Sequence, residues 1–287
     1  MTHVFSVINL KGGVGKTTTS VALAEVFSAE MGKKALLIDL DPQTNATIMM
    51  LGENKWAELN KNGHTLAQLF KAALDPKEAD FDLKATLQKN VSDVGEAKSV
   101  DLLPSSLDLI DVQDRLVTVS SGQFFAVNPI ELLHRAIKSK LDKYDVAIID
   151  CPPSLGIVTL NGLRISEGYI IPTIPDYLST YGIPQIVTRV SKFSKAIGDG
   201  IDPLGIVVTK FQANSTVHKN VLRQLKAKDD DPKIYETVIK QTNFASAASE
   251  HRQRSRTLRQ KYGDGSEGLT ASYIQLAHEI WDQLEGS

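Results

Sequence analysis

Cysteine, long apolar runs and excess charge of either sign are all scarce in this chain of 287 residues. The single cysteine, Cys151, excludes a disulfide framework within one chain and a metal cluster built from several cysteines. No uninterrupted apolar run approaches the roughly 20 residues that a membrane-spanning helix needs. The formal net charge is only −2, so any nucleic-acid binding would depend on a local basic patch.

A secretory signal is also missing from the first residues. The chain opens with Thr2-His3-Val4-Phe5, without a basic segment followed by an apolar stretch and a small-residue cleavage site. Composition is that of an ordinary globular protein, with 42% hydrophobic and 23% charged residues, which argues against disorder, collagen and coiled coil. We therefore expect a cytoplasmic globular protein.

What is present is an alternation of short apolar segments with amphipathic helical patterns. Several of the apolar segments are apolar on both faces, which is typical of parallel strands covered by helices on both sides. The pattern predicts a doubly wound α/β fold with a mostly parallel sheet. The predicted strands are Val4–Asn9, Ala35–Asp39, Asp101–Pro104, Val146–Asp150, Tyr169–Ile174 and Ile206–Thr209, and the clearest helices are Thr17–Ala29, Thr180–Ile197, Val217–Lys226 and Leu269–Leu284.

The domain organisation predicted from the sequence is simple. No internal repeat and no low-complexity linker divides the chain, so we expect one domain over residues 1–287. The polar, weakly patterned region at about 52–99 is interpreted as an elaboration of that domain, and a C-terminal helix is expected at about 269–285. Asp229–Pro232 has the composition of a surface loop.

A glycine-rich segment at residues 10–18 carries the strongest functional signal. It reads Leu-Lys-Gly-Gly-Val-Gly-Lys-Thr-Thr and lies between a predicted strand and a predicted helix, which is the context of a phosphate-binding loop. Glycines let backbone N–H groups curl around phosphates, and the helix N-terminus adds partial positive charge. Lys16 is expected to contact the β- and γ-phosphates and Thr17 to bind Mg²⁺. Leu10 occupies the first glycine position of the usual motif, and the alternative is a glycine-rich turn without a ligand.

Carboxylates end two further predicted strands. Asp39 and Asp41 follow one strand, and Asp150 ends another. Ligands of open parallel sheets bind at the carboxyl ends of the strands, so these groups and the glycine-rich loop should meet in one crevice. Each aspartate alone could be a helix cap, and their coincidence with the loop favours the functional interpretation.

Together these motifs resemble the ParA/MinD family of P-loop ATPases with a deviant Walker A motif. The resemblance runs from about Val4 to the C-terminus and implies ATP and Mg²⁺ as cofactors. It implies that Lys11 reaches across an ATP-sandwich dimer to the partner's nucleotide, and that Asp41 orients the attacking water. It makes Lys11, Lys16 and Asp41 catalytic, and Thr17, Asp39 and Asp150 the metal-site residues. The implied nucleotide-binding residues are Lys11, Gly12, Gly13, Val14, Gly15, Lys16, Thr17 and Thr18, the last at the α-phosphate.

On the nucleoside side the chain departs from the family pattern. A later segment that often contains proline in the family reads Val238-Ile239-Lys240-Gln241 here. The segment near Thr209–Phe211, which corresponds to the adenine-contacting loop, is not diagnostic either. The residues that hold the base therefore stay open at the level of sequence.

Several relatives can be weighed against one another. The C-terminal helix carries Glu279, Asp282 and Glu285, which anionic lipid would repel, so a MinD-like membrane helix is not expected. One cysteine cannot supply the cluster ligands of a nitrogenase iron protein. The chain is expected to have no room for the additional catalytic domain of a cobyrinic acid diamide synthase, and it lacks the C-terminal tyrosine cluster of the related kinases.

A basic segment that runs from about Arg252 to Lys261 instead favours a DNA-binding, ParA-like protein. Sequence-independent affinity for DNA comes mainly from Lys and Arg contacts with phosphates. The alternative for such a segment is a solvated helix face. Lys219, Arg223 and Lys226 could extend the patch, and no helix-turn-helix segment is expected ahead of the P-loop. The predicted DNA-binding residues are Arg252, Arg254, Arg256, Arg259 and Lys261.

The resemblance thus implies a slow ATP hydrolase that forms a homodimer with ATP, binds double-stranded DNA without sequence preference and associates with the nucleoid. A ParB-like or McdB-like adaptor protein would stimulate hydrolysis, and the cargo could be a plasmid, a chromosome or a carboxysome. No membrane contact is expected. The alternatives are a MinD-like membrane-associated regulator of the division site and the nucleotide domain of a cobyrinic acid diamide synthase-like enzyme.

Overall fold

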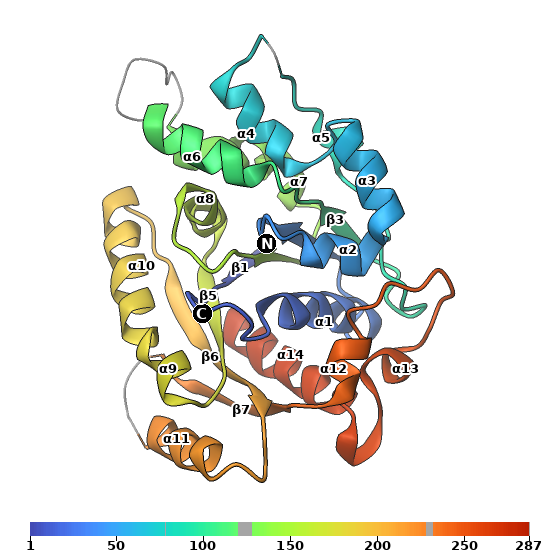
Figure 1. The fold of residues 1–287 in the computed structure, drawn as a ribbon, viewed down its shortest axis with the longest axis vertical. Coiled ribbons are helices and arrows are strands. Elements are labelled where there is room, and N and C mark those ends of the chain that lie inside the picture. Colours follow the sequence, from blue (N-terminus) through green and yellow to red (C-terminus); the bar gives the residue numbers. More distant parts are fainter. Residues whose placement is uncertain (78, 120–127, 228–231, 287) are drawn as a thin grey trace.

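A seven-stranded sheet forms the centre of the computed structural model, which describes residues 1–77, 79–119, 128–227 and 232–286. Neighbouring strands run parallel in the order β3-β2-β4-β1-β5-β6-β7 (Figure 1). The α/β fold predicted from the sequence is confirmed. The strands are β1 (His3–Val7), β2 (Ala35–Asp39), β3 (Val100–Leu103), β4 (Val146–Asp150), β5 (Gly168–Thr173), β6 (Asp202–Phe211) and β7 (Ile234–Lys240).

Helices connect the strands and cover both faces of the sheet. They are α1 (Lys16–Ala29), α2 (Asn45–Leu51), α3 (Glu53–Lys61), α4 (Leu66–Leu74), α5 (Leu83–Thr86), α6 (Leu109–Val119), α7 (Leu132–Leu141), α8 (Ile157–Ile165), α9 (Tyr177–Tyr181), α10 (Ile183–Ile197), α11 (Thr216–Lys226), α12 (Asn243–Ala247), α13 (Leu258–Tyr262) and α14 (Thr270–Glu285), with 3-10 turns η1 (Pro129–Glu131) and η2 (Gly265–Glu267). In Figure 1, α1 and α14 lie on one face, and α4, α6, α7 and α8 lie on the other. No helix in the described part of the chain is both long and apolar enough to cross a membrane.

Burial on both faces explains the apolar composition of the central strands. Every residue of β2 and β4 is buried. Leu37 belongs to the core that α1 and α14 complete, whereas its neighbour Ile38 belongs to the core on the opposite face. The apolar stripe of α14, including Tyr273 and Ile280, packs into the first of these cores. This stripe is core packing, as the sequence indicated, and not a surface for lipid.

The sequence predictions and the structure differ mainly at the sheet edge and in the elaborated region. All six predicted strands are present, but β7 was not predicted. It is an edge strand in which buried and exposed residues alternate, with Glu236 and Lys240 exposed, so its sequence is less apolar than that of a central strand. The region at 52–99 contains the short helices α3, α4 and α5. The loop predicted at Asp229–Pro232 lies almost entirely outside the described residues.

Strand register determines which side chains meet at the carboxyl edge of the sheet. Asp150, the last residue of β4, is paired with Val7 of β1 on one side and with Asp39 of β2 on the other. The segment after β1 therefore begins beside two carboxylates that are far away in the sequence. This edge is where the predicted functional residues come together.

Candidate functional site

The glycine-rich loop links β1 to α1 with a backbone that depends on its glycines. Gly13 and Gly15 have φ angles of 76° and 86°, in the left-handed region that side chains with a Cβ rarely adopt. Thr209 on β6 donates a hydrogen bond of 2.7 Å from its hydroxyl to the carbonyl of Val14. Asn9 donates a bond of 2.8 Å to the Pro172 carbonyl on β5. The loop is therefore fixed from two neighbouring strands and opens directly into α1.

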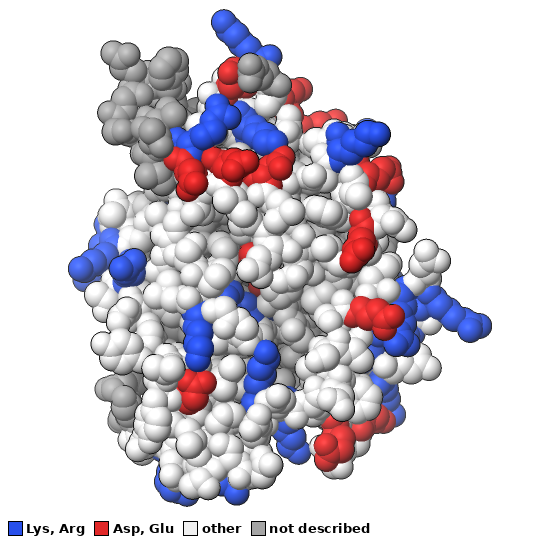
Figure 2. Space-filling view, in the orientation of Figure 1, with Lys and Arg blue, Asp and Glu red and all other residues white. Residues whose placement is uncertain are grey.

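A cavity of about 380 Å³ lies against this loop. Its walls contain most of the predicted phosphate-binding residues and Asp41, together with α2, the β4 loop and the segment after α12. The lining residues are Gly12, Gly13, Gly15, Lys16, Thr17, Thr18, Asp41, Gln43, Asn45, Ile48, Met49, Pro153, Lys210 and Ser249. Figure 2 shows Lys and Arg side chains around the hollow at the centre of this face. The cavity combines backbone donors with positive charge, as an anion such as a phosphate requires.

Lys16 is the buried cation of the site. It is only 6% exposed, and its ammonium group donates a 3.4 Å hydrogen bond to the carbonyl of Lys11 in the same loop. Burial lowers the pKa of Lys16, and the charges of Asp150 and Asp41 oppose this change. A phosphate beside Lys16 would supply the compensating charge that burial makes valuable.

Asp150 has an unused oxygen directed at the same region. Its Oδ1 accepts a 3.0 Å hydrogen bond from Ser20, whereas its buried Oδ2 has no hydrogen-bond partner among the described residues. Burial raises the pKa of Asp150 to about 7, and the nearby charge of Asp41 adds to the rise, while Thr17 and Lys16 oppose it. An unsatisfied buried carboxylate oxygen beside the Thr17 hydroxyl fits a site for Mg²⁺ and its water ligands.

Asp39 has a different task from the other two carboxylates. Its Oδ1 accepts a hydrogen bond of 3.0 Å from the Asp41 backbone, and its Oδ2 accepts bonds from the backbone and hydroxyl of Thr47. Burial raises the pKa of Asp39, and the charge of Asp150 acts in the same direction. Both oxygens are occupied locally, so Asp39 positions the loop that carries Asp41.

That loop is conformationally strained where it enters α2. Thr44 has a φ of 58°, which is costly for a β-branched residue, and it is buried. The backbone N–H of Thr44 donates a 2.9 Å hydrogen bond to the Asp41 carbonyl. The Asp41 carbonyl also accepts a 2.7 Å bond from the Ser105 hydroxyl after β3. The main chain at Asp41 is thus held at the cavity wall by a bond within its own loop and by one from the segment after β3.

Lys11 lies at the mouth of the loop and does not point at the Lys16 cavity. Its side chain is 40% exposed, and its ammonium group donates a 2.8 Å hydrogen bond to the Ser179 hydroxyl on α9. Both carboxylate oxygens of Asp176 lie 3.5 Å from the same nitrogen. The residues that hold Lys11 were not among those singled out from the sequence, because nothing local marks an aspartate and a serine far from the P-loop as its neighbours.

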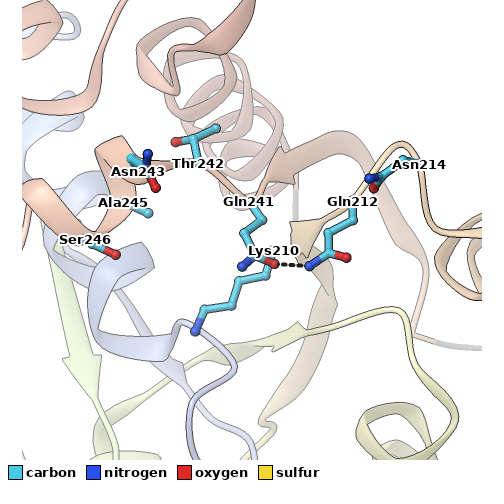
Figure 3. A pocket seen from close by; sticks show the side chains of 8 residues that line it. All are labelled: Lys210, Gln212, Asn214, Gln241, Thr242, Asn243, Ala245 and Ser246. Atoms are coloured by element: carbon cyan, nitrogen blue, oxygen red, sulfur yellow. Dashed lines mark hydrogen bonds between the residues drawn. The ribbon is translucent and has the colours of Figure 1, made fainter.

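A second hollow of about 480 Å³ adjoins the first, and Lys210 lines both. Figure 3 shows amide side chains from two chain segments facing it, with the Gln212 amide donating a 2.6 Å hydrogen bond to Gln241. Lys210 has a φ of 50°, which again marks a strained residue at the site. The hollow therefore lies between the segments that the sequence left unassigned, and its lining residues are Lys210, Gln212, Asn214, Gln241, Thr242, Asn243, Ala245 and Ser246.

The predicted DNA-binding segment needs correction at two of its five residues. Lys261 is fully buried and lies between Glu25 and Asp93, at 2.7 and 2.8 Å. Arg256 has a side chain only 5% exposed and pairs with Asp93 at 2.9 Å. These two cations balance buried acids and are not available for phosphates. The sequence could not separate them from exposed neighbours, because burial here depends on α1 and on the loop at 91–95.

The other three basic residues of the segment are exposed. Arg252 lies 3.1 Å from Glu250 and Arg259 lies 3.4 Å from Asp264, and both pairs are at the surface. Arg254 is exposed as well. In Figure 2, basic side chains project at the right edge, where the loop between α12 and α13 lies in Figure 1.

Known proteins resemble this chain over most of its length. A family profile described as an AAA domain matches residues 2–202. The sporulation initiation inhibitor protein Soj of Bacillus subtilis is 32% identical over 88% of this chain and 89% of its own. The chain belongs to the ParA/MinD family of P-loop ATPases. Another relative in this family, the chromosome-partitioning ATPase Soj of Treponema pallidum, is 29% identical over 85% of each chain.

Solved structures have the same fold. A structure of cobyrinic acid a,c-diamide synthase from Mycobacterium smegmatis with ADP and magnesium has a TM-score of 0.74, is 25% identical and covers 99% of this chain and 96% of its own. The chain length therefore does not separate this protein from that enzyme, contrary to the sequence-based argument. The ATP complex of a Cyanothece McdA variant has a TM-score of 0.72 at 18% identity, covers 98% of both chains and shows the likeness of the fold.

Proposed function

We propose that this member of the ParA/MinD family is a ParA-like positioning ATPase that dimerises with ATP and binds DNA without sequence preference. The main support for this proposal is the grouping of charged residues at the candidate site. A buried lysine, the N-terminus of α1 and Asp41 line one cavity at the carboxyl edge of a parallel sheet, where Asp39 and Asp150 end two neighbouring strands. Residues 1–287 act as a single ATPase domain, with 52–99 as an elaboration.

ATP and Mg²⁺ fit the residues that line the cavity. The P-loop N–H groups and Lys16 would hold the β- and γ-phosphates, and Thr18, which lines the same cavity, would contact the α-phosphate. Among the described residues, no group of three or more His, Cys, Asp or Glu side chains could hold a metal ion, so a metal here needs oxygen ligands from the nucleotide. Thr17 and the free oxygen of Asp150 would supply the protein's part of the Mg²⁺ site, and the ion would neutralise phosphate charge.

Hydrolysis requires a positioned water and a stabilised γ-phosphate. Asp41 is fixed at the wall by contacts with Thr44 and Ser105, so its carboxylate can orient the water. Lys16 stabilises the charge that develops on the phosphate. Lys11, which lies outside its own cavity, reaches the partner's nucleotide in the dimer and acts like an arginine finger supplied in trans.

The nucleoside part of ATP occupies the second hollow. This hollow adjoins the phosphate cavity, because Lys210 lines both, and its amide side chains can exchange hydrogen bonds with a base. Gln241 belongs to the segment Val238-Ile239-Lys240-Gln241, which takes the place of a segment that often contains proline in the family. Substitution of Gln241 should therefore change the affinity for the base and leave the phosphate contacts intact.

DNA binding relies on the exposed part of the basic segment. Arg252 and Arg259 have only surface ion pairs, which are weak enough to exchange for phosphate contacts. On α11, Lys219, Arg223 and Lys226 are exposed at helical spacing along one face and form a second basic group, apart from the loop between α12 and α13 (Figure 1). Chromosome partition, named for a Soj relative, is the activity that such a nucleoid-associated surface would serve.

The proposed cycle ends with a partner protein. A ParB-like or McdB-like adaptor stimulates slow hydrolysis, the dimer separates and DNA is released. A plasmid, a chromosome or a carboxysome would be the cargo, and no membrane takes part. The test is to measure dimerisation and DNA binding of the purified chain with and without ATP and Mg²⁺. We expect both to require ATP, and DNA binding to fall steeply with salt. Equal DNA affinity without nucleotide would contradict the proposal.

A second candidate function is the ATP-dependent amidation named for the Mycobacterium smegmatis structure, because that structure aligns with nearly the whole of both chains. An enzyme of that kind would turn over ATP in response to its substrate. Turnover that rises with cobyrinic acid and glutamine, and does not respond to DNA, would favour this alternative over the positioning ATPase.

A further inference from the structure

Helix α9 lies directly beside Lys11 and has a polar side organised around Asp176. As the N-cap residue, Asp176 accepts a hydrogen bond of 2.7 Å from the Ser179 backbone and one of 2.8 Å from the Ser179 hydroxyl. The same two side chains contact the ammonium group of Lys11, at 2.8 Å from Ser179 and 3.5 Å from Asp176. Three residues thus form one connected cluster, and Lys11 has a defined position in the free chain.

The electrostatics of this cluster favour the charged pair. Burial would raise the pKa of Asp176, but hydrogen bonds from Ser179 and the charge of Lys11 outweigh it and hold the pKa below its usual range. The carboxylate is therefore ionised at neutral pH and attracts the lysine. Because the Lys11 side chain is 40% exposed, the attraction is modest and can be broken.

The opposite side of α9 is apolar and uncovered. Tyr177, Leu178 and Tyr181 are 62%, 80% and 75% exposed, and all three belong to a helix of only five residues. Leu178 is more exposed than any other large apolar side chain of the described chain except that of Met1. Neighbouring apolar side chains without charge are typical of the core of a protein interface, where tyrosine is enriched and Asp, Glu and Lys are depleted.

We propose that α9 couples dimerisation to the release of Lys11: Asp176 and Ser179 hold this lysine in the free chain, and Tyr177, Leu178 and Tyr181 form part of the surface that a second copy covers. The inference rests on the proposed function, in which Lys11 must face the partner's nucleotide. A residue that reaches the partner lies at the dimer interface, and α9 contacts that residue directly. The apolar side of α9 is therefore continuous with the proposed interface.

A consequence is that the free chain restrains its own catalytic lysine. Lys11 must leave Asp176 and Ser179 before it can bind a phosphate of the partner, so these contacts compete with dimer formation. The competition keeps the amine away from its own nucleotide site and makes the dimer depend on two ATP molecules that can replace the lost contacts. Asp176 is thus a positioning residue that acts through Lys11.

The first experiment tests the apolar surface. Tyr177→Ser, Leu178→Ser and Tyr181→Ser are combined, and the monomer–dimer equilibrium is measured by sedimentation with Mg²⁺ and the non-hydrolysable analogue AMPPNP. We expect dimerisation at least about tenfold weaker, with unchanged AMPPNP binding by the monomer and an unchanged circular dichroism spectrum. Val217→Ser on α11, where the side chain is 46% exposed, is the matched control and should dimerise normally. An unchanged dimerisation constant in the triple variant would overturn the inference.

The second experiment tests the polar side of α9. Asp176→Asn keeps a good N-cap residue but removes the charge, and Ser179→Ala removes the shortest contact with Lys11. The double variant should dimerise about two- to fivefold more tightly with AMPPNP, because the competing contacts are gone. Asp199→Asn, which alters an exposed ion pair with Arg164, is the control. Dimerisation that is unchanged or weaker in the double variant would contradict the restraint on Lys11.

Different results would refute the proposed ATP-sandwich dimer and the proposed role of α9. A wild-type chain that binds AMPPNP but stays monomeric would refute the ATP-sandwich dimer and with it the role of α9. A wild-type chain that dimerises, while both α9 variants behave like their controls, would refute only the coupling through α9.

Discussion

Asp39 and Asp150 lie side by side in register at the ends of β2 and β4, and both are fully buried. Burial raises the pKa of each carboxyl; the charge of Asp150 raises the pKa of Asp39 further, and the charge of Asp41 does the same for Asp150. The two differ in their hydrogen bonds. Asp39 uses both oxygens to hold the loop around Asp41, whereas Asp150 keeps one oxygen free. Asp39 thus positions the loop at the site, and Asp150 keeps an oxygen that can still accept a hydrogen bond.

Removal of the buried cation should weaken nucleotide binding. Lys16→Gln keeps a polar, unbranched side chain, although a shorter one, and removes the positive charge of this cavity-lining residue. We expect ATP affinity to fall by about 10- to 100-fold, because a charge-assisted hydrogen bond in a buried site is lost. Equilibrium titration with a fluorescent ATP analogue measures the change. Lys219→Gln on α11 serves as the control, and ATP affinity of Lys16→Gln equal to that of the wild type would exclude the assignment.

Asp41 and Lys11 should separate binding from turnover. Asp41→Ala and Lys11→Ala are both expected to lower the hydrolysis rate by about 100-fold or more, since each removes a group that acts on the attacking water or on the developing charge. Asp41→Ala should still bind ATP, because the phosphate contacts of Lys16 and the loop remain. Phosphate release and ATP binding are measured on the same samples. Normal turnover by either variant would remove its catalytic role.

Thr209 should contribute to ATP affinity although it lies on β6 and not in the phosphate loop. Its hydroxyl is within hydrogen-bond distance of the Val14 carbonyl at 2.7 Å and the Thr173 carbonyl at 3.2 Å. Thr209→Val preserves the shape but leaves these buried acceptors without that donor, which corresponds to about 1 kcal/mol, or roughly a fivefold loss of ATP affinity. Isothermal titration calorimetry provides the measurement. Thr216→Val on α11 is the control, and an unaltered affinity of Thr209→Val would show that the loop does not need this support.

The sequence predicted the centre of the fold well because local and global signals agree there. The strand that ends at Asp150 is apolar on both faces, and the glycine-rich loop has backbone requirements that few other sequences meet. The contacts of Lys11 and the burial of Lys261 could not be predicted in this way. Both depend on residues more than 150 positions away along the chain. The local sequence pattern around Lys11 or Lys261 therefore does not indicate these contacts.

The buried charge cluster around Asp93 should make stability depend on acid pH. Burial would raise the pKa of Asp93, but the charge and hydrogen bond of Lys261 and the charge of Arg256 outweigh it, so the pKa is lowered in the folded chain. A lowered pKa means that folding favours the ionised form. The resulting stability is complete above the ordinary pKa and is lost as pH falls through the lower folded value.

Asp93→Asn should therefore reduce the free energy of unfolding at pH 7 and flatten its decline below about pH 4. Lys261→Met should be the more harmful change, by about 3–5 kcal/mol, because it leaves Glu25 and Asp93 buried without their shared cation. Urea denaturation between pH 3 and 7 measures both effects. Asp264→Asn in an exposed ion pair should retain the wild-type profile, and an equally steep decline in Asp93→Asn would contradict the role of the cluster.

The basic segment should divide into exposed residues that bind DNA and buried residues that hold the fold. Arg252→Glu with Arg254→Glu reverses two exposed charges, and we expect duplex DNA affinity to fall by about tenfold or more at low salt, equally for unrelated sequences. The slope of log affinity against log salt should become shallower by roughly two, because about two phosphate contacts are lost.

Arg256→Gln provides the contrast within the same segment. Arg256 pairs with Asp93 in the interior, so its replacement should lower thermal stability. At temperatures where the variant is folded, the salt dependence of its DNA binding should be unchanged. Fluorescence anisotropy over a series of salt concentrations, combined with thermal unfolding, distinguishes the two classes. If the exposed double variant bound DNA as tightly as the wild type, the phosphate contacts would have to come from elsewhere, and the α11 residues Lys219 and Arg223 would be the next to reverse.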